Sequence, residues 1–337
     1  MKIYLDNTKK YYKSNLHCQS TNSDGKATPE KIKEEYIKRG YSVVAYTEHE
    51  HIASNMHLTD ENFIAITGFE MGIGDDKPWN PHTRQFVKVT HLNFYALDPN
   101  NDTTICTSPK NDKWGSQEPR DTLKYDGCGH MRQYSPEGIS AIIKYAHEHG
   151  FLVCYNHPVW SNELDGEYLS YDGIDFVEIF NTGCDTHGLG SDEHTFDIML
   201  KQGKHVACIA ADDNHNSRGF DAVNCDSFGG WVMINADKLT YADIMDALRA
   251  HRFYASCGPE IYSLVREGNV VSVKTSPAKR ISKQTDGRQG AMVIAERGEY
   301  ITEASFEVKE NEKFFRITVE DEHGKRAYTQ AYETYDN

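Results

Sequence analysis

Residues 15–25 read Asn-Leu-His-Cys-Gln-Ser-Thr-Asn-Ser-Asp-Gly, and they place His17 and Asp24 where an early strand gives way to a turn. Ser23-Asp24-Gly25 is a turn sequence. A turn alone does not need a histidine ahead of it. A metal site does, because imidazole nitrogen and carboxylate oxygen are ligands that first-row divalent cations prefer. The stretch therefore predicts a strand that ends at a metal site.

Four further apolar runs end in the same way, with His, Asp or Glu at the C-terminal end. Residues 43–46 lead to His49, 63–66 to Glu70, 151–154 to His157, and 206–209 to Asp213 and His215. A lone histidine near a strand end is usually a hydrogen-bonded structural residue. Five such ends in series favour one shared site. Asp212 competes with Asp213, and the two-residue spacing to His215 favours Asp213.

The segments between these runs have helix signals. Helices are expected from Thr28 to Gly40, from Ser135 to Gly150, over 192–201 and over 240–250. Repeated strand–helix units predict a parallel sheet or a barrel, in which catalytic groups gather at the C-terminal strand ends. After Gly258 the helices stop and short alternating segments follow. We therefore expect an α/β unit at 1–258 and a small all-β unit at 259–337.

The composition and charge of the chain exclude some classes of partner. The chain has 337 residues and a formal net charge of −15, which argues against nucleic-acid polymers and anionic membranes as partners. Any anionic substrate is then small and held by local cations. The first residues lack the apolar run of a signal peptide, and no stretch approaches a membrane span. A cytoplasmic protein is expected, and its eight scattered cysteines are expected to be reduced.

The candidate ligands exceed the needs of one tetrahedral ion. They are His17, Asp24, His49, Glu70, His157, Asp213 and His215. Two or three divalent ions, Mn, Fe or Zn, are therefore expected, with a carboxylate such as Glu70 able to bridge them. Closely spaced metals bind an anionic ester, lower the pKa of a bridging water and stabilise the leaving oxygen, so hydrolysis is the predicted reaction.

In chain order, the motifs are His17-x-Gln19 with Ser23-Asp24-Gly25, Glu48-His49, Gly68-Phe69-Glu70, Asn156-His157-Pro158, Val177-Glu178-Ile179-Phe180-Asn181 and Asp213-Asn214-His215. This order resembles the polymerase and histidinol phosphatase (PHP) family of metal-dependent phosphoesterases, over roughly residues 12–258. The resemblance implies a distorted (β/α)7 barrel with a two- or three-metal centre that hydrolyses phosphate mono- or diesters.

The C-terminal part carries a second resemblance. Its segments are Phe253-Tyr254-Ala255-Ser256, Gly258-Pro259-Glu260 and Val319-Glu320-Asp321. They resemble the β appendage of the family branch that includes the carbaryl-hydrolase-like proteins. The resemblance to that branch does not determine which type of bond is cleaved. A structural role or a homo-oligomer surface is expected for this part.

One residue departs from the family pattern. The first motif of the family usually has two histidines, and here the second is Gln19, whose uncharged amide is a poorer ligand. We expect one metal position to be weakened, or lost to leave a binuclear site. A further family ligand should follow the Glu178 strand, where His187 and Asn181 compete. Glu48 is expected to orient His49 or a neighbouring backbone amide, and Glu178 and Asn181 to support the ligands from behind.

Substrate contacts are expected from three residues. Arg84 and Arg218 are candidates for gripping phosphate through a bidentate fork. His91 begins a strand, so it is either a substrate contact or acid, or a buried structural residue. The long loops 72–84 and 98–134 are either pocket walls or surface decoration.

The predicted activity is that of a metal-dependent phosphoesterase, in which a metal-bridging hydroxide attacks phosphorus and Glu70, Asp213 and His215 are catalytic. One alternative is a hydrolase of a non-phosphate ester, an amide or a carbamate, favoured by an aromatic pocket with Trp79 or Trp160 facing in. The other alternative is an inactive metal-binding module. Gln19 supports it, because an amide replaces a histidine in the first motif.

Overall fold

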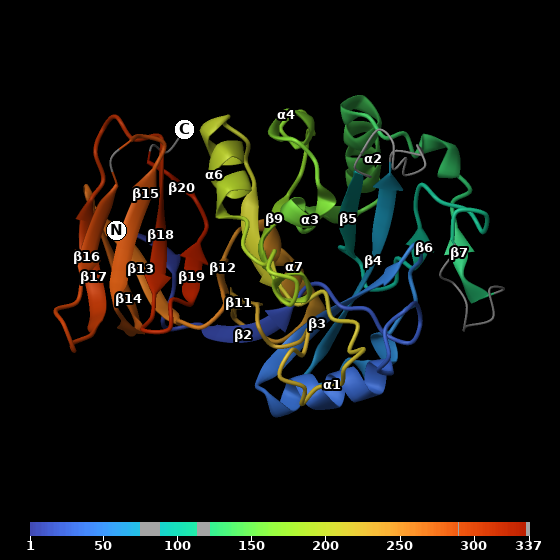
Figure 1. Ribbon diagram of the computed structural model, residues 1–337, viewed down its shortest axis with the longest axis horizontal. Coiled ribbons are helices and arrows are strands. Elements are labelled where there is room, and N and C mark those ends of the chain that lie inside the picture. Colours follow the sequence, from blue (N-terminus) through green and yellow to red (C-terminus); the bar gives the residue numbers. More distant parts are fainter. Residues whose placement is uncertain (75–87, 113–121, 289, 335–337) are drawn as a thin grey trace.

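The computed structural model describes residues 1–74, 88–112, 122–288 and 290–334. A long mixed sheet dominates it (Figure 1). Its strand order is β10 (Ala207–Ala211), β9 (Phe176–Asn181), β8 (Phe151–Tyr155), β5 (Val89–Ala96), β4 (Ile64–Gly74), β3 (Tyr41–His49), β2 (Lys10–Asn15), β11 (Trp231–Ala236), β12 (Phe253–Ser256), β19 (Arg326–Thr329), β18 (Phe314–Glu320), β15 (Arg280–Thr285) and β16 (Ala291–Ile294), with β20 (Tyr332–Glu333) paired to β18.

The directions of the strands determine which strand ends lie together at one edge of the sheet. β2, β3 and β4 are parallel to one another, and so are β8, β9 and β10. β5 lies between the two groups and is antiparallel to both β4 and β8, so the two groups run in the same direction. Their C-terminal ends therefore meet at one edge of the sheet, as the sequence predicts. The sheet is mixed where the sequence predicts a parallel sheet or a barrel, because β5 and β11 run against their neighbours.

The longer helices connect strands and cover the sheet. They are α1 (Pro29–Lys38), α2 (Pro136–Glu148), α6 (Glu193–Lys201) and α7 (Tyr241–Arg249). Three begin at caps that the sequence predicts, because the Thr28, Ser135 and Thr240 side chains each accept a backbone N–H from the first helical turn. The shorter elements are α3 (Pro158–Ser161), α4 (Asp165–Tyr168), α5 (Thr182–Asp185), η1 (Met56–Leu58), η3 (Gly129–Met131), β6 (Thr103–Thr104) and β7 (Lys124–Tyr125).

The core lies on both faces of the sheet because side chains alternate along each strand. In β3, Val43 and Ala45 pack into the cluster that contains residues of β4, β11 and α7. Val44 and Tyr46 point to the opposite face and pack with Ile32 of α1. This double burial explains why the strand reads as a continuous apolar run. The residues at the C-terminal end of β3 therefore follow a strand that is packed on both faces.

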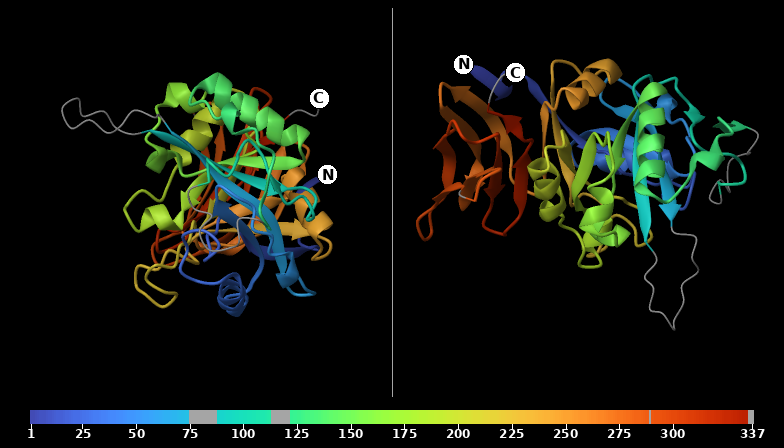
Figure 2. Two further views of the ribbon diagram at one scale, coloured as in Figure 1. Left: turned by 90° about the vertical axis from the view of Figure 1, so that its right-hand side faces the viewer. Right: turned by 90° about the horizontal axis from the view of Figure 1, so that it is seen from above.

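The C-terminal part is all-β, as the sequence predicts. β1 (Lys2–Leu5), β13 (Ile261–Glu267), β14 (Val270–Ala278) and β17 (Ile301–Glu307) form an antiparallel sheet in this order. Its apolar side chains pack against β15 and β18 of the long sheet. Figure 2 shows these strands on one side of the molecule, with the N-terminus beside them because β1 pairs with β13. The domain boundary at 258 stays a prediction.

The long sheet does not close into a barrel by hydrogen-bonded ladders among the described residues. A side chain bridges part of the gap. Cys208 of β10 donates its N–H to Gln330 Oε1 at 2.7 Å, and Gln330 Nε2 donates to the Cys208 carbonyl at 2.9 Å and to the Phe253 carbonyl of β12 at 3.4 Å. The Gln330 amide therefore takes the place of a neighbouring strand and links β10 to β12.

Other expectations concern cysteines and membranes. All eight cysteines are free thiols, as expected. Of the helices in the described segments, not one has both the length and the apolar character needed to cross a bilayer.

Replacing Gln330 by leucine should lower the free energy of unfolding by about 2–6 kcal/mol, because two buried backbone groups of Cys208 lose their partner and each costs about 1–3 kcal/mol. Urea unfolding measures the change. Gln202→Leu, at an exposed position after α6, should stay within about 0.5 kcal/mol of the parent protein. A loss below about 1 kcal/mol for Gln330→Leu would contradict the bridging role.

Candidate metal centre

The edge where the parallel strands end is lined by His, Asp and Glu side chains. A cavity of about 590 Å³ opens there. Its walls include six of the predicted ligands: Asp24, His49, Glu70, His157, Asp213 and His215. The seventh, His17, is fully buried and contacts Glu70 from below the cavity surface. The structure thus brings together all seven side chains that the sequence placed in one site.

Glu70 is the hub of this arrangement. Its carboxylate is buried and contacts side chains on both oxygens. Oε2 lies 3.2 Å from His17 Nε2, 3.1 Å from His49 Nδ1 and 3.0 Å from Gln19 Nε2, and Oε1 lies 2.8 Å from His91 Nδ1, 2.9 Å from Asn156 Nδ2 and 3.4 Å from His157 Nε2. Because its two oxygens face different ligands, this carboxylate is placed to bridge two cations.

The charge of Glu70 follows from its surroundings. Burial by itself would raise its pKa, but the positive charges of His17, His91 and His49 outweigh burial and hold the pKa well below the ordinary value. Burial would likewise lower the pKa of His17, and the nearby carboxylates of Asp213, Glu70 and Glu178 instead raise it well above 6.5. The centre is therefore an anion enclosed by positive charge, a role that metal ions can take over.

Three groups of side chains have the geometry of a metal site. They are Asp24, His49 and His215; Glu70, His91 and His157; and His17, Glu70 and Asp213. Within each group the ligand atoms lie within 4.8 Å of one another. The donors are imidazole nitrogens and carboxylate oxygens, with no thiolate, as expected for Mn, Fe or Zn. The groups share Glu70 or adjoin it, so up to three neighbouring ions fit.

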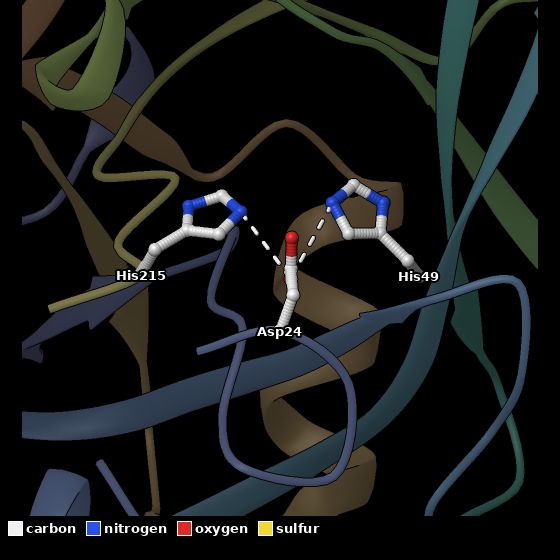
Figure 3. A group of neighbouring side chains, drawn as sticks. All are labelled: Asp24, His49 and His215. Carbon is white, nitrogen blue, oxygen red and sulfur yellow. Dashed lines mark ion pairs between the residues drawn. The ribbon is translucent and has the colours of Figure 1, made fainter. Parts of the chain in front are cut away.

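The group of Asp24, His49 and His215 is drawn in Figure 3. Asp24 Oδ1 lies between the two rings, 3.7 Å from His49 Nε2 and 3.4 Å from His215 Nε2. Burial would lower the pKa of His215, but its hydrogen bond to Asp24 and the charge of Asp213 raise the pKa to about 9. A metal ion bound here must therefore displace a proton from His215 at neutral pH.

The group around His17 carries a direct sign of fit to a cation. His17 Nε2 lies 3.2 Å from both Glu70 Oε2 and Asp213 Oδ1. It meets the geometry of a hydrogen bond with neither, although it is fully buried. His17 Nδ1 is instead fixed by Glu178 Oε1 at 2.6 Å. A carboxylate behind an imidazole that leaves the other nitrogen aimed between carboxylates is the usual arrangement of a metal-ligating histidine.

Glu178 and Asn181 contact candidate ligands that come from several strands. Glu178 Oε2 accepts the His157 N–H and the Asn181 side-chain amide, both at 2.8 Å. The same Asn181 Nδ2 lies 3.2 Å from Asp213 Oδ2. The Asn181 amide therefore links the Glu178 carboxylate to the Asp213 carboxylate.

Two ligands sit on strained backbone. His157 has φ = 29° and Asp213 has φ = 53°, in the left-handed region that residues with a Cβ rarely adopt. The N–H of His157 donates to Glu178, and that of Asp213 donates to the His17 carbonyl at 2.9 Å. Such conformations cluster at functional sites, where contacts hold them in place.

The choice between neighbouring acids follows from their partners. Asp212 points away from the cavity and accepts hydrogen bonds from the Tyr36 hydroxyl at 2.8 Å, Thr182 Oγ1 at 2.7 Å and the Gly229 N–H at 3.1 Å. It ties α1, α5 and the segment before β11 together. Asp213 is the residue that reaches the candidate groups.

Gln19 and Glu48 have positioning contacts. Gln19 Nε2 donates to Glu70 Oε2 at 3.0 Å and to the Thr47 carbonyl at 3.1 Å. Its other side-chain atom, Oε1, is buried and has no hydrogen-bond partner among the described residues, so Gln19 lies beside the centre with one acceptor unused. Glu48 accepts the Ser20 N–H at 3.0 Å and the Ser23 hydroxyl at 2.6 Å. It thus orders the loop that carries Asp24, which agrees with the expected contact to a backbone amide.

His91 lies at the centre of the site. The sequence predicts either a substrate contact or acid, or a buried structural residue, and in the structure His91 Nδ1 lies 2.8 Å from Glu70, in a candidate metal group with Glu70 and His157. His91 does not lie at the C-terminal end of a strand. It reaches the site because β5 is antiparallel to its neighbours, so the beginning of β5 lies at the edge where the parallel strands end. The sequence feature that indicates this position is a histidine near the beginning of a strand.

The remaining expected residues lie at the rim or beyond the described segments. Arg218 and His187 are exposed and line the cavity, outside the three candidate groups. Arg84 and Trp79 lie outside the described residues. Trp160 lines the cavity, with its ring centroid 4.8 Å from that of His157 and 5.2 Å from that of His91.

Comparison with known proteins gives a likeness in structure only. No protein-family model and no curated protein matches the sequence. A two-domain protein from Bacteroides vulgatus, described as containing a predicted PHP-like metal-dependent phosphoesterase, is 13% identical, with 97% of this chain and 96% of that chain covered and a TM-score of 0.43.

Two shorter matches cover 60% of this chain and 87% of the other. A candidate metal-dependent phosphoesterase from Bifidobacterium adolescentis is 15% identical, with a TM-score of 0.37. An amidohydrolase from Chromobacterium violaceum, with bound sulfate and no metal, is 13% identical, with a TM-score of 0.39. The first match names the family that the motifs resemble. Because these TM-scores are below 0.5, conclusions about the chemistry of the site come from the geometry of this chain alone.

Glu178→Gln should weaken metal binding at the His17 group by about 10–100-fold, because a neutral amide orients and polarises the imidazole less than a carboxylate does. Calorimetric titration of the metal-free protein with Zn²⁺ or Mn²⁺ measures the change. Glu167→Gln, which removes a charge that pairs with Lys88 away from the cavity, is the matched control and should leave binding unchanged. Equal affinity in the two variants would contradict the role of Glu178.

The number of ions tests the effect of Gln19. Protein loaded with Mn²⁺ and then dialysed is expected to keep two ions per chain, whereas Gln19→His should keep three, because an imidazole adds a ligand at the weakened position. Elemental analysis gives the count. Asp24→Asn should lose one of the two retained ions. The same count in Gln19→His and the parent protein would show that Gln19 does not limit loading.

Proposed function

We propose that this chain is a metal-dependent hydrolase that cleaves a small phosphate mono- or diester. The observation that carries the proposal is the sharing of Glu70 between candidate metal groups at the floor of one cavity. Neighbouring cations in such a site supply Lewis acidity, activate water and offset the charge of the leaving oxygen. The proposal extends to the fold, as a distorted seven-stranded barrel whose open side is bridged by Gln330.

The chain's own residues have distinct tasks in this reaction. Glu70, Asp213 and His215, with the other candidate ligands, would hold the cations in fixed places, since the low pKa of the buried Glu70 carboxyl keeps it ionised and its partners are imidazoles. Glu178 keeps His17 in the tautomer that presents Nε2 to the centre. Arg218 at the exposed rim is free to turn its guanidinium toward an anionic group that enters the cavity.

The proposed substrate is a small anion. The cavity of about 590 Å³ has the size of a site for a small organic molecule. The net charge of −15 disfavours a nucleic-acid polymer or an anionic membrane as a partner. A cytoplasmic location and a homo-oligomer formed through the C-terminal strands belong to the same proposal.

A second candidate is a hydrolase of a carboxylic ester, an amide or a carbamate. It is favoured by Trp160, which gives the cavity an aromatic wall beside His91 and His157. The same ligand set would serve this reaction, since a carbonyl oxygen is polarised by a cation as a phosphoryl oxygen is. The two candidates therefore differ in the substrate and agree on the centre.

The proposal predicts that protein reconstituted with Mn²⁺, Fe²⁺ or Zn²⁺ hydrolyses 4-nitrophenyl phosphate. Glu70→Gln should lower kcat/KM by at least about 100-fold, because one substitution disturbs two metal positions. Release of 4-nitrophenol measures the rate, and Glu167→Gln is the control. Turnover of 4-nitrophenyl acetate or a 4-nitrophenyl carbamate without turnover of the phosphate would establish the second candidate. Turnover of none of them would leave an inactive metal-binding module.

A further inference from the structure

Trp160 is an exposed aromatic side chain that lies directly beside the candidate centre. It belongs to the short helix α3, which follows His157 without a gap. Its side chain is 44% exposed and lines the cavity. Single exposed apolar residues are common on protein surfaces and need no explanation by themselves. Trp160 differs because it contacts the rings of His157 and His91, two members of one candidate metal group.

The geometry of these contacts leaves indole surface uncovered. The interplanar angle is 76° with His157 and 51° with His91, so neither imidazole lies flat on the indole. Both imidazoles meet the indole at an angle, and the Trp160 side chain remains partly exposed. An indole face that is open to a cavity is a platform for a planar group.

The cavity has a polar end and an aromatic end. The ring centroids of His215 and His49 are 5.8 Å apart, those of His49 and His91 5.9 Å, and those of His91 and Trp160 5.2 Å. Arg218 lies three residues after His215 and also lines the cavity. The series thus leads from the Asp24 group to the indole, and a molecule bound over the candidate ligands would reach Trp160 with the part that is not charged.

The size of the cavity agrees with such a molecule. A volume of about 590 Å³ falls in the range that accommodates organic ligands with a ring system, well beyond the need of a phosphate group alone. Carboxylates and imidazoles form its floor. Trp160 is the aromatic residue among the described lining residues apart from the histidines. Recognition of a planar apolar group therefore falls to this side chain.

We propose that Trp160 determines specificity by stacking on a planar aromatic group of the ester substrate, beside the bond that is cleaved. The substrate class is then an anionic ester that carries an aryl, benzyl or heteroaromatic group. The cleavage of such an ester rests on the proposed function, whereas the binding of its planar group rests on Trp160 alone.

The test compares two phosphate monoesters of nearly equal size, benzyl phosphate and cyclohexylmethyl phosphate. Both leaving groups are primary alcohols, so the intrinsic reactivity of the two esters is similar and the shape of the ring is the main difference. The metal-loaded protein should favour the planar ester by about 10-fold or more in kcat/KM, the lower part of the effect expected for stacking on an aromatic side chain.

Variants at two adjacent positions assign the preference. Trp160→Ala should bring the ratio of the two kcat/KM values close to one, and Trp160→Phe should keep part of it, because a smaller ring stacks over less area. Val159→Ala is the matched control, since Val159 is the neighbouring residue, is also 44% exposed and does not line the cavity. It should keep the full ratio. A ratio that Trp160→Ala leaves unchanged would overturn the proposal.

A binding measurement separates this inference from the proposed reaction. Benzylphosphonate and cyclohexylmethylphosphonate cannot be hydrolysed at the ester position, and calorimetric titration of the metal-loaded protein gives their Kd values. Tighter binding of the planar phosphonate, lost in Trp160→Ala, would support the role of Trp160 even in the absence of phosphatase activity. Equal binding of the two compounds, or no binding of either, would overturn it while leaving hydrolysis to be judged by the nitrophenyl substrates.

Discussion

The Glu70 carboxylate is the constraint on which the rest of the structure depends. It is 1% exposed, and an anion that far from water is tolerated only where charge and hydrogen-bond donors surround it. Its neighbours come from the ends of β2, β3 and β8 and from the beginning of β5. Assembly of the sheet therefore assembles the donors. Because most of these donors are imidazoles, the groups that hold the anion are also the groups that can hold cations.

At the same edge of the sheet, two candidate ligands have a strained backbone conformation. His157 and Asp213 both leave their strands through left-handed backbone, which costs of order 1 kcal/mol or more for residues with a Cβ. Glu178 offsets this by accepting the His157 N–H while it orients His17. One buried carboxylate thus couples the backbone geometry of one candidate ligand to the ring orientation of another.

The C-terminal strands also contribute to the site, although they carry none of the ligands in the described groups. Gln330 replaces a missing strand beside β10, and Asp213 follows β10 after one intervening residue. Arg316 of β18, only 1% exposed, donates to Asp197 and Glu193 of α6 at 2.8 and 3.3 Å. These buried links tie the all-β part to the helix and strand that flank the centre, so that its packing supports the position of a ligand.

Local patterns in the sequence predict which strands end in His, Asp or Glu, where helices are capped, and that strands make up the C-terminal part. These features are local, since capping residues, apolar runs and turn residues act over a few positions. The tertiary structure alone decided that β5 runs against its neighbours and so delivers His91 to Glu70, that Gln19 turns its amide nitrogen toward Glu70, and that Gln330 bridges β10 and β12. Strand direction and side-chain partners depend on pairing between distant segments, and local sequence preference does not encode that pairing.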